Sequence, residues 1–134
     1  MLRVKLQACT GCRACTILCA LSHEGQLEVR RARIRVAKNL PTLGRPVFRP
    51  VFCRMCKKAQ CVAVCPTGAL TQDDAKGLVH LAPEVCNGCG LCVEACPFQA
   101  IWVDDQMGKA LKCDLCGGEP LCVHYCAPGA ITFD

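Results

Sequence analysis

Long apolar runs are absent from this sequence of 134 residues, and no apolar leader stands ahead of the first cysteine motif, which begins at Cys9. A membrane-spanning helix needs about 20 mostly apolar residues, and a secretory signal needs an apolar stretch of about 7–15. We therefore expect a cytoplasmic protein without direct membrane insertion, unless a partner's signal exports it inside a complex. The length suits one ordinary domain at most.

Large aromatic side chains are also scarce, since the chain has only four phenylalanines, one tryptophan and one tyrosine. The hydrophobic fraction of 52% overstates the core because it counts the cysteines. So few large side chains cannot fill a generous core, and small domains of this kind need staples. Bound inorganic groups would both fill the interior and hold the chain together.

Acidic residues are missing from a long segment, because none occurs between Glu28 and Asp73. The basic residues include an alternating run, 30–35, which we interpret as a half-buried strand with a basic face. No nucleic-acid reading motif or stacking platform accompanies this run, so we expect no nucleic-acid partner. The basic face is predicted either to dock an acidic partner subunit or to offset negative groups inside the protein.

Cysteine is abundant, with sixteen residues that fall into four groups of four. The first group is Cys9, Cys12, Cys15 and Cys19, spaced C-x2-C-x2-C-x3-C. The second is Cys53, Cys56, Cys61 and Cys65, spaced C-x2-C-x4-C-x3-C. The third repeats the first spacing at Cys86, Cys89, Cys92 and Cys96. The fourth is Cys113, Cys116, Cys122 and Cys126, spaced C-x2-C-x5-C-x3-C.

Groups one and three have the spacing of the bacterial ferredoxin run, in which three cysteines bind one 4Fe-4S cluster and the fourth binds a neighbouring one. Small residues in these loops let backbone N–H groups approach a cluster closely: Gly11, Ala14, Gly88 and Gly90. Structural zinc also uses C-x2-C pairs, but it usually combines two separated pairs. Zinc and disulfides are the alternatives, and the spacing favours iron–sulfur clusters.

A second repeat follows the fourth cysteine of groups two, three and four, at 65–70, 96–101 and 126–131. Each copy predicts a turn followed by a short strand. Two of these strands lead into charged turns, and we predict return strands at Leu78–Leu81 and Lys109–Lys112. Short strands, turns and short helical turns together predict an α+β fold.

The motif order resembles the four-cluster ferredoxin-like subunits of oxidoreductases such as dimethyl sulfoxide reductase and formate dehydrogenase. Five stretches look most like the small iron–sulfur subunits that accompany tungsten-containing aldehyde oxidoreductases: 9–15, 22–25, 33–36, 52–56 and 112–118. Related subunits serve carbon monoxide dehydrogenases, hydrogenases and benzoyl-CoA reductases, and these stay open as alternatives. Ala20 and Ala127 stand where the family usually has proline, so we expect looser turns there.

The resemblance implies a nested arrangement of two two-cluster ferredoxin modules in a single polyferredoxin domain, 1–134. The inner module would be 45–105, and the outer module would combine 1–40 with 106–134. In the inner module, one cluster would be bound by Cys53, Cys56, Cys61 and Cys96, and the other by Cys86, Cys89, Cys92 and Cys65. In the outer module, one would be bound by Cys9, Cys12, Cys15 and Cys126, and the other by Cys113, Cys116, Cys122 and Cys19. Spacing alone also permits pairing group one with two and group three with four.

The sequence offers no catalytic residues, because it has no phosphate-binding glycine loop, no nucleophile–base pair and no flavin fingerprint. We interpret His23 as a surface-loop residue. The resemblance implies an electron-transfer subunit with four 4Fe-4S clusters and a large catalytic partner, a tungsten or molybdenum pterin enzyme. A flavin subunit or further copies of the chain are additional candidate partners. The alternative from another class is a zinc-binding interaction module.

Overall fold

The computed structural model describes residues 1–41 and 44–134, which form two compact units. The first unit combines Met1–Val51 with Leu115–Asp134, and the second is Phe52–Asp114. In sequence, the second unit is therefore inserted between the two segments that form the first unit. The inner module expected from the resemblance, 45–105, begins seven residues before the second unit and ends nine residues before it does, and the nested modules and their cluster content stay a prediction.

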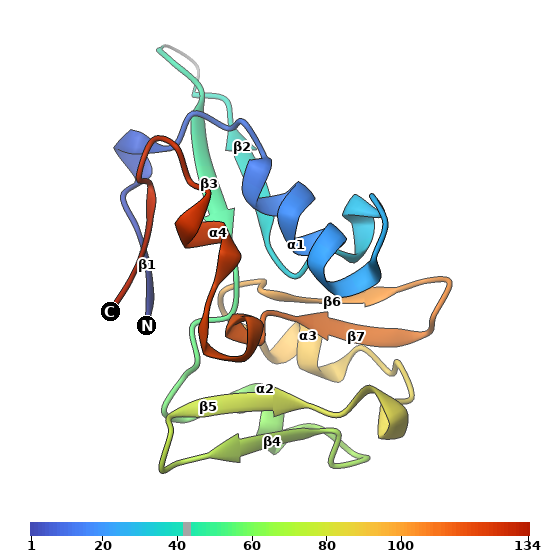
Figure 1. Cartoon of the computed structure of the whole chain (residues 1–134). Coiled ribbons are helices and arrows are strands. Elements are labelled where there is room, and N and C mark those ends of the chain that lie inside the picture. The colour runs from blue at the N-terminus through green and yellow to red at the C-terminus, as the bar shows by residue number, and fades with distance from the viewer. Residues whose placement is uncertain (42–43) are drawn as a thin grey trace. The chain divides into compact units, whose positions relative to one another are not determined.

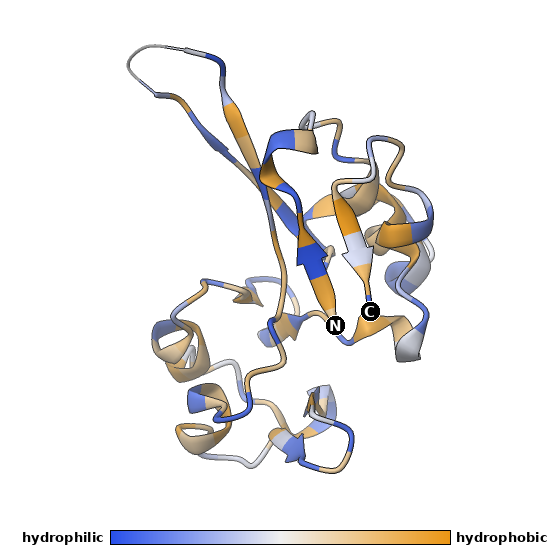
Figure 2. Cartoon of the chain, turned by 90° about the vertical axis from the view of Figure 1, so that its left-hand side faces the viewer, coloured by the Kyte–Doolittle hydropathy of each residue, from blue (hydrophilic) through white to orange (hydrophobic). Residues whose placement is uncertain are grey.

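Two strand pairs lie in the first unit, both antiparallel (Figure 1). β1 (Leu2–Val4) pairs with β8 (Ile131–Phe133), which brings the two ends of the chain together. β2 (Arg35–Asn39) pairs with β3 (Val47–Val51). Hydrophobic and hydrophilic residues alternate along β1 in Figure 2, as expected for a strand with one buried face.

The helices of the first unit are α1 (Ala14–Glu24) and α4 (Leu121–His124), which pack against each other. Single turns of 3-10 helix occur at Leu6–Ala8 and Val29–Arg31, and a tight helical turn with left-handed residues at Leu115–Gly118. α1 continues past Cys19 because Ala20, unlike proline, keeps its N–H and does not clash with the preceding turn. The looser turn expected at Ala20 is therefore wrong, and Ala20 is fully buried in the helix.

The second unit contains two antiparallel hairpins and two short helices (Figure 1). The first hairpin joins β4 (Leu70–Asp73) to β5 (Leu78–Leu81), and the second joins β6 (Ile101–Asp104) to β7 (Lys109–Lys112). The helices are α2 (Gln60–Ala63) and α3 (Leu91–Ala95), with a 3-10 turn at Pro83–Val85. The predicted return strands and the α+β class are confirmed.

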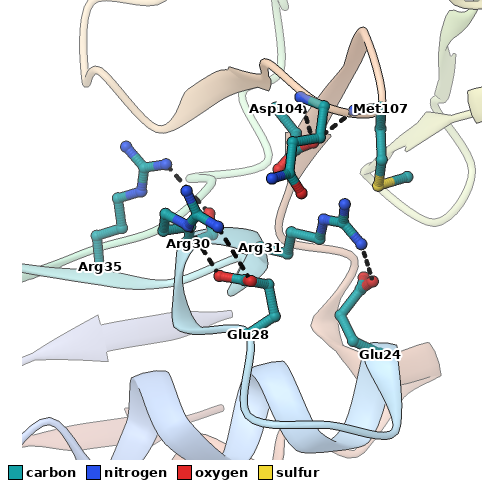
Figure 3. A network of polar contacts seen from close by, with 8 residues as sticks. Glu24, Glu28, Arg30, Arg31, Arg35, Asp104 and Met107 are labelled. Carbon is teal, nitrogen blue, oxygen red and sulfur yellow. Dashed lines mark hydrogen bonds and ion pairs between the residues drawn. The ribbon is translucent and has the colours of Figure 1, made fainter.

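Both hairpin turns are closed in the same way, by an aspartate at the end of the incoming strand. The Asp73 carboxylate accepts from the Lys76 N–H at 3.1 Å. The Asp104 carboxylate accepts from the backbone N–H groups of Gln106 at 3.1 Å and Met107 at 2.7 Å (Figure 3). A glycine with positive φ, Gly77 or Gly108, then returns the chain to the second strand.

The core is thin, as the scarcity of aromatic residues predicts. The largest fully buried side chains are Phe52 and Pro50, and many other buried positions are alanines or cysteines. Such a core supplies little hydrophobic stabilisation for a chain of this length. Within the described residues, no helix is long and apolar enough to cross a membrane.

The basic run differs from the half-buried strand that its alternation predicts. Val29–Arg31 is a 3-10 turn, and the strand begins only at Arg35. The alternation nevertheless predicts correctly which side chains are buried, since Ala32 and Ile34 are 0% and 2% exposed. Ion pairs with acidic residues that lie nearby in sequence fix this turn: Arg30 with Glu28 at 3.0 Å and Arg31 with Glu24 at 3.6 Å (Figure 3).

Candidate metal centre

All four cysteine groups share one backbone feature at the residue before their second cysteine. Each of these residues has a left-handed backbone, with φ between 49° and 74°: Gly11, Met55, Gly88 and Leu115. Successive N–H groups in such a turn point into its concave side, which is how backbone nests hold anionic groups. A side chain at this conformation costs roughly 1–2 kcal/mol. Met55 and Leu115 are 3% and 5% exposed, so their burial offsets this cost.

Two glycines in these turns lie against other parts of their own unit. A Cβ at Gly11 would collide with the ring of Phe48 on β3, and a Cβ at Gly88 would collide with the Gly108 carbonyl between β6 and β7. Hairpins therefore pack directly on cysteine loops in both units. The small residues in these loops are visible in the sequence, but the groups that lie against them are not.

The first cavity of the second unit is lined by four cysteines, Cys53, Cys56, Cys61 and Cys96. We call it the Cys53 cavity. Three of its cysteines come from group two, and the fourth comes from the end of α3. The guanidinium of Arg54, which also lines the cavity, lies 5.0 Å from the centre of the Phe52 ring and 5.9 Å from that of Phe98. The Ala100 N–H donates to the Cys96 sulfur at 3.4 Å.

Gln72 on β4 holds the longer loop of group two, a role that the sequence analysis missed. Its amide nitrogen donates to the carbonyls of Cys56 at 3.2 Å and Lys57 at 2.7 Å, and its amide oxygen accepts from the Ala59 N–H at 3.4 Å. The two additional residues of this loop have backbone groups that no strand partner binds, and the Gln72 side chain provides hydrogen bonds for them. No local sequence signal marks a strand glutamine for this task.

The second cavity of this unit, the Cys86 cavity, is lined by Cys65, Cys86, Cys89 and Cys92. Its loop is shaped by Asn87, whose side-chain oxygen accepts from the Cys89 N–H at 3.2 Å. The Ala110 N–H donates to the Cys86 sulfur at 3.4 Å. Each cavity therefore takes three cysteines from one group and the fourth from the other.

The pKa values of the cavity thiols show how closely they are grouped. Burial raises the pKa of Cys92 to about 11, helped by the neighbouring thiols of Cys86, Cys89 and Cys61. Burial, then Cys53 and Cys96, raises the pKa values of Cys56 and Cys61. These three thiols resist ionisation without a cation, and a metal group that binds thiolates relieves this resistance. The donor set therefore fits a thiolate-bound cluster, and loading it would release protons.

The pKa of Cys65 shifts in the opposite direction, below its ordinary value. Burial raises its pKa, but the Leu70 N–H, the Thr67 hydroxyl and N–H, and the Ala69 N–H together outweigh burial and lower it. The Thr67 hydroxyl oxygen lies 3.7 Å from the Cys65 sulfur. The turn that follows the fourth cysteine thus stabilises its thiolate, which suits a metal ligand.

In the first unit, Cys9, Cys12 and Cys15 are grouped around one loop. Burial raises the pKa of Cys15, the side chain and N–H of Thr16 lower it, and the thiols of Cys12 and Cys9 raise it further. The pairing of this trio with Cys126 stays a prediction. Cys116, Cys122 and Cys19 also belong to the first unit, whereas Cys113 belongs to the second, so this pairing likewise rests on the resemblance.

Cys19 has two neighbours from its own unit. The Arg33 N–H donates to its sulfur at 3.2 Å, and His23 Nδ1 lies 3.6 Å from this sulfur and 2.8 Å from the Cys19 carbonyl oxygen. His23 is a half-buried residue in the last turn of α1, so its interpretation as a surface-loop residue is wrong. The four-residue spacing of Cys19 and His23 on a helix is the sequence signal that predicts their contact.

Replacing Gly88 by alanine is expected to impair the Cys86 cavity more than replacing Gly90. Both glycines have positive φ, so both substitutions strain the backbone by roughly 1–2 kcal/mol. Only at Gly88 would the new Cβ also meet a backbone carbonyl, whereas nothing lies within 4 Å of a Cβ at Gly90. Iron content after anoxic purification measures the difference, and equal losses in G88A and G90A would contradict the prediction.

Comparison with known proteins shows the family to which the chain belongs. Residues 45–134 match the 4Fe-4S dicluster domain, and residues 6–22 match a 4Fe-4S binding domain. The chain is 41% identical over 118 residues to the polyferredoxin-like subunit of aliphatic sulfonate oxidoreductase from Pyrococcus furiosus. It is 36% identical over 137 residues to the thiosulfate reductase electron transfer subunit PhsB of Salmonella typhi.

The matched regions cover most of this chain but less of some relatives. The alignments span 88% of the chain and 66% of the Pyrococcus protein, and 93% of the chain and 70% of PhsB. In the beta subunit of NADH-dependent phenylglyoxylate dehydrogenase from Aromatoleum evansii, the chain spans only 27% of the length at 35% identity. The fold resembles a chain of the active site complex BamBC of benzoyl coenzyme A reductase, with a TM-score of 0.54 over 98% of this chain and 76% of that one, at 24% identity. The cysteine motifs and the domain match together place the protein in the 4Fe-4S dicluster domain family of ferredoxin-like iron–sulfur proteins.

Proposed function

We propose that the protein is an electron-transfer subunit with four 4Fe-4S clusters that serves a larger catalytic oxidoreductase. The observation that carries this proposal is the lining of the two cavities of the second unit, each with four thiols. Such clusters, when bound, accept and release single electrons. With all four cysteines of a set engaged, no position is left open for a substrate, so the chemistry belongs to a partner.

The proposed wiring follows the nested scheme. Cys53, Cys56, Cys61 and Cys96 bind one inner cluster, and Cys65, Cys86, Cys89 and Cys92 bind the other. The shared lining of each cavity supports this exchange of the fourth cysteine. The outer clusters are assigned to Cys9, Cys12, Cys15 and Cys126, and to Cys19, Cys113, Cys116 and Cys122. The effect of the Cys12 and Cys9 thiols on the pKa of Cys15 supports the first of these sets in part.

The proposed partner is a cytoplasmic tungsten-containing aldehyde oxidoreductase, because the cysteine loops resemble those of its small subunits. Relatives named as subunits of sulfonate oxidoreductase and thiosulfate reductase make an enzyme of sulfur compounds the main competitor. The benzoyl-CoA reductase alternative has a similar fold in its favour. A cytoplasmic location accords with sixteen cysteines that must stay reduced until clusters are inserted.

Anoxic purification from the native host is expected to recover this chain with a much larger redox protein. Metal analysis of the complex then separates the candidates, since a tungsten enzyme carries stoichiometric tungsten. Isolated protein that oxidises a substrate alone, or that never co-purifies with a larger enzyme, would contradict the proposal.

The same purification tests which charges dock the partner. Arg30 and Arg31 already form ion pairs within their unit, so charge reversal there would disturb the fold as well as docking. Arg49 is exposed on β3, within the segment that lacks acidic residues, and it is the better probe. R49E is expected to weaken recovery of the partner, most strongly at low salt. K76E, at an exposed turn of the second unit, is the matched control.

A further inference from the structure

Lys112 is a buried lysine at the end of β7, and only 3% of it is exposed. Among the buried residues, it is the only charged one in the described part of the chain. Its ammonium donates to the carbonyl of Val79 on β5 at 2.5 Å and to the Cys113 carbonyl at 2.7 Å. Burying a cation costs several kcal/mol unless something compensates for the lost water.

No carboxylate supplies that compensation within residues 1–41 and 44–134, where the ion pairs all join residues of the first unit and none involves Lys112. The third neighbour of the ammonium is the thioether of Met55, at 3.9 Å. Met55 is itself held in place, because its sulfur accepts from the Val79 N–H at 3.4 Å and lies 3.9 Å from the Cys53 sulfur. Neutral groups therefore orient a full positive charge without cancelling it.

The Cys53 cavity adjoins the groups that surround the Lys112 ammonium. Val79 lines the cavity, and Met55 precedes Cys56 in the turn that shapes it. The Met55 sulfur lies 3.9 Å from the Lys112 ammonium and 3.9 Å from the sulfur of Cys53, which lines the cavity, so one side chain separates the positive charge from a cavity thiol. The Lys112 ammonium, which has no carboxylate partner, thus lies near the cavity where a thiolate-bound cluster would carry negative charge.

We propose that Lys112 is the internal counter-charge of the cluster bound by Cys53, Cys56, Cys61 and Cys96, and that it raises the reduction potential of this cluster. Addition of one electron forms and breaks no bond, and it makes the site more negative by one unit. A nearby buried cation stabilises this extra charge, since solvent screens it little. The inference rests on the proposed cluster assignment. Lys112 would act through its positive charge and would not be a ligand of the cluster.

The test compares K112Q, K112R and wild-type protein, all purified anoxically with their clusters. Glutamine keeps a donor but removes the charge, whereas arginine keeps the charge. With iron content unchanged, K112Q is expected to lower one reduction potential by about 59 mV, which is a tenfold change in a one-electron equilibrium. K112R is expected to shift it far less. A redox titration followed by electron paramagnetic resonance measures each potential separately.

Two further variants keep the result interpretable. C61S is expected to alter the resonance signal of this cluster and so to identify it. If C61S altered no single signal, the cluster assignment would be wrong, and the inference about Lys112 would fail with it. Lys58 lines the same cavity but is exposed, so K58Q is expected to shift the potential much less. K112Q with full iron and an unchanged potential would overturn the inference, as would an equal shift in K58Q. Loss of iron in both K112Q and K112R would instead assign Lys112 a purely structural role.

Discussion

Anoxically purified protein is expected to contain roughly sixteen iron and sixteen sulfide ions per chain. This number follows from four cysteine quartets, each with the ligand count of one cluster. Iron and sulfide assays on the same sample measure it, together with the broad visible absorbance of iron–sulfur proteins. Stoichiometric zinc with little sulfide would contradict the prediction and favour a zinc-binding module.

Removal of the clusters is expected to unfold most of the chain. The core offers few large side chains, with Phe52 and Pro50 as the largest that are fully buried. The four sheets of residues 1–41 and 44–134 are two-stranded pairs, and such pairs are marginal in water without further support. Chelation followed by circular dichroism should therefore show loss of the hairpin and helix signals. A chelated protein that kept its native spectrum and melted cooperatively would show that the apolar core suffices.

The sequence predicts the hairpins of the second unit well, because their signals are local. Asp73 and Asp104 end a strand and close a turn, and a glycine follows each at the position that needs positive φ. The return strands at Leu78–Leu81 and Lys109–Lys112 have the predicted bounds. Local turn chemistry fixes these elements without help from distant residues.

Other features depend on contacts between distant residues, and the sequence does not predict them. The run 30–35 looks like a strand by alternation, but ion pairs of Arg30 and Arg31 with nearby glutamates favour a 3-10 turn. Met55 has a left-handed backbone that normally indicates glycine, and only its burial explains it. In the sequence, Lys112 looks like an ordinary exposed lysine of a strand. Only the structure shows that it is buried, with its ammonium bound to the Val79 carbonyl of another strand.

The cysteine sets differ in how far sequence and structure together define them. For the second unit, the resemblance predicts two quartets with exchanged fourth cysteines, and the cavity linings group the same eight residues. For the first unit, the loop of Cys9, Cys12 and Cys15 is compact, but the fourth ligand rests on the resemblance. The exchange in the second unit is therefore the part of the wiring that mutation can test most sharply.

Substitution of Cys65 is expected to damage the cluster bound by Cys86, Cys89 and Cys92, and to spare the one bound by its neighbours in sequence. The reason is geometric, because Cys65 lines the Cys86 cavity and Cys61 lines the Cys53 cavity. Each single variant, C65A, C92A or C61A, is expected to lose up to about four iron ions, the content of one cluster. Electron paramagnetic resonance of the reduced proteins should show C65A and C92A altering the same signal and C61A altering another.

Double variants give the decisive comparison, because two substitutions at one cluster cannot remove it twice. C65A combined with C92A is expected to lose no more iron than either single variant, whereas C65A combined with C61A is expected to lose about twice as much, near eight ions. Both pairs remove two thiols from the same unit, so each controls for general destabilisation. The opposite pattern, with additive loss for C65A and C92A and none beyond the single variants for C65A and C61A, would mean that each group of four cysteines binds its own cluster. The exchanged pairing makes each cluster depend on cysteines of both groups, so loss of Cys65 should damage the cluster whose other three ligands lie in the other group.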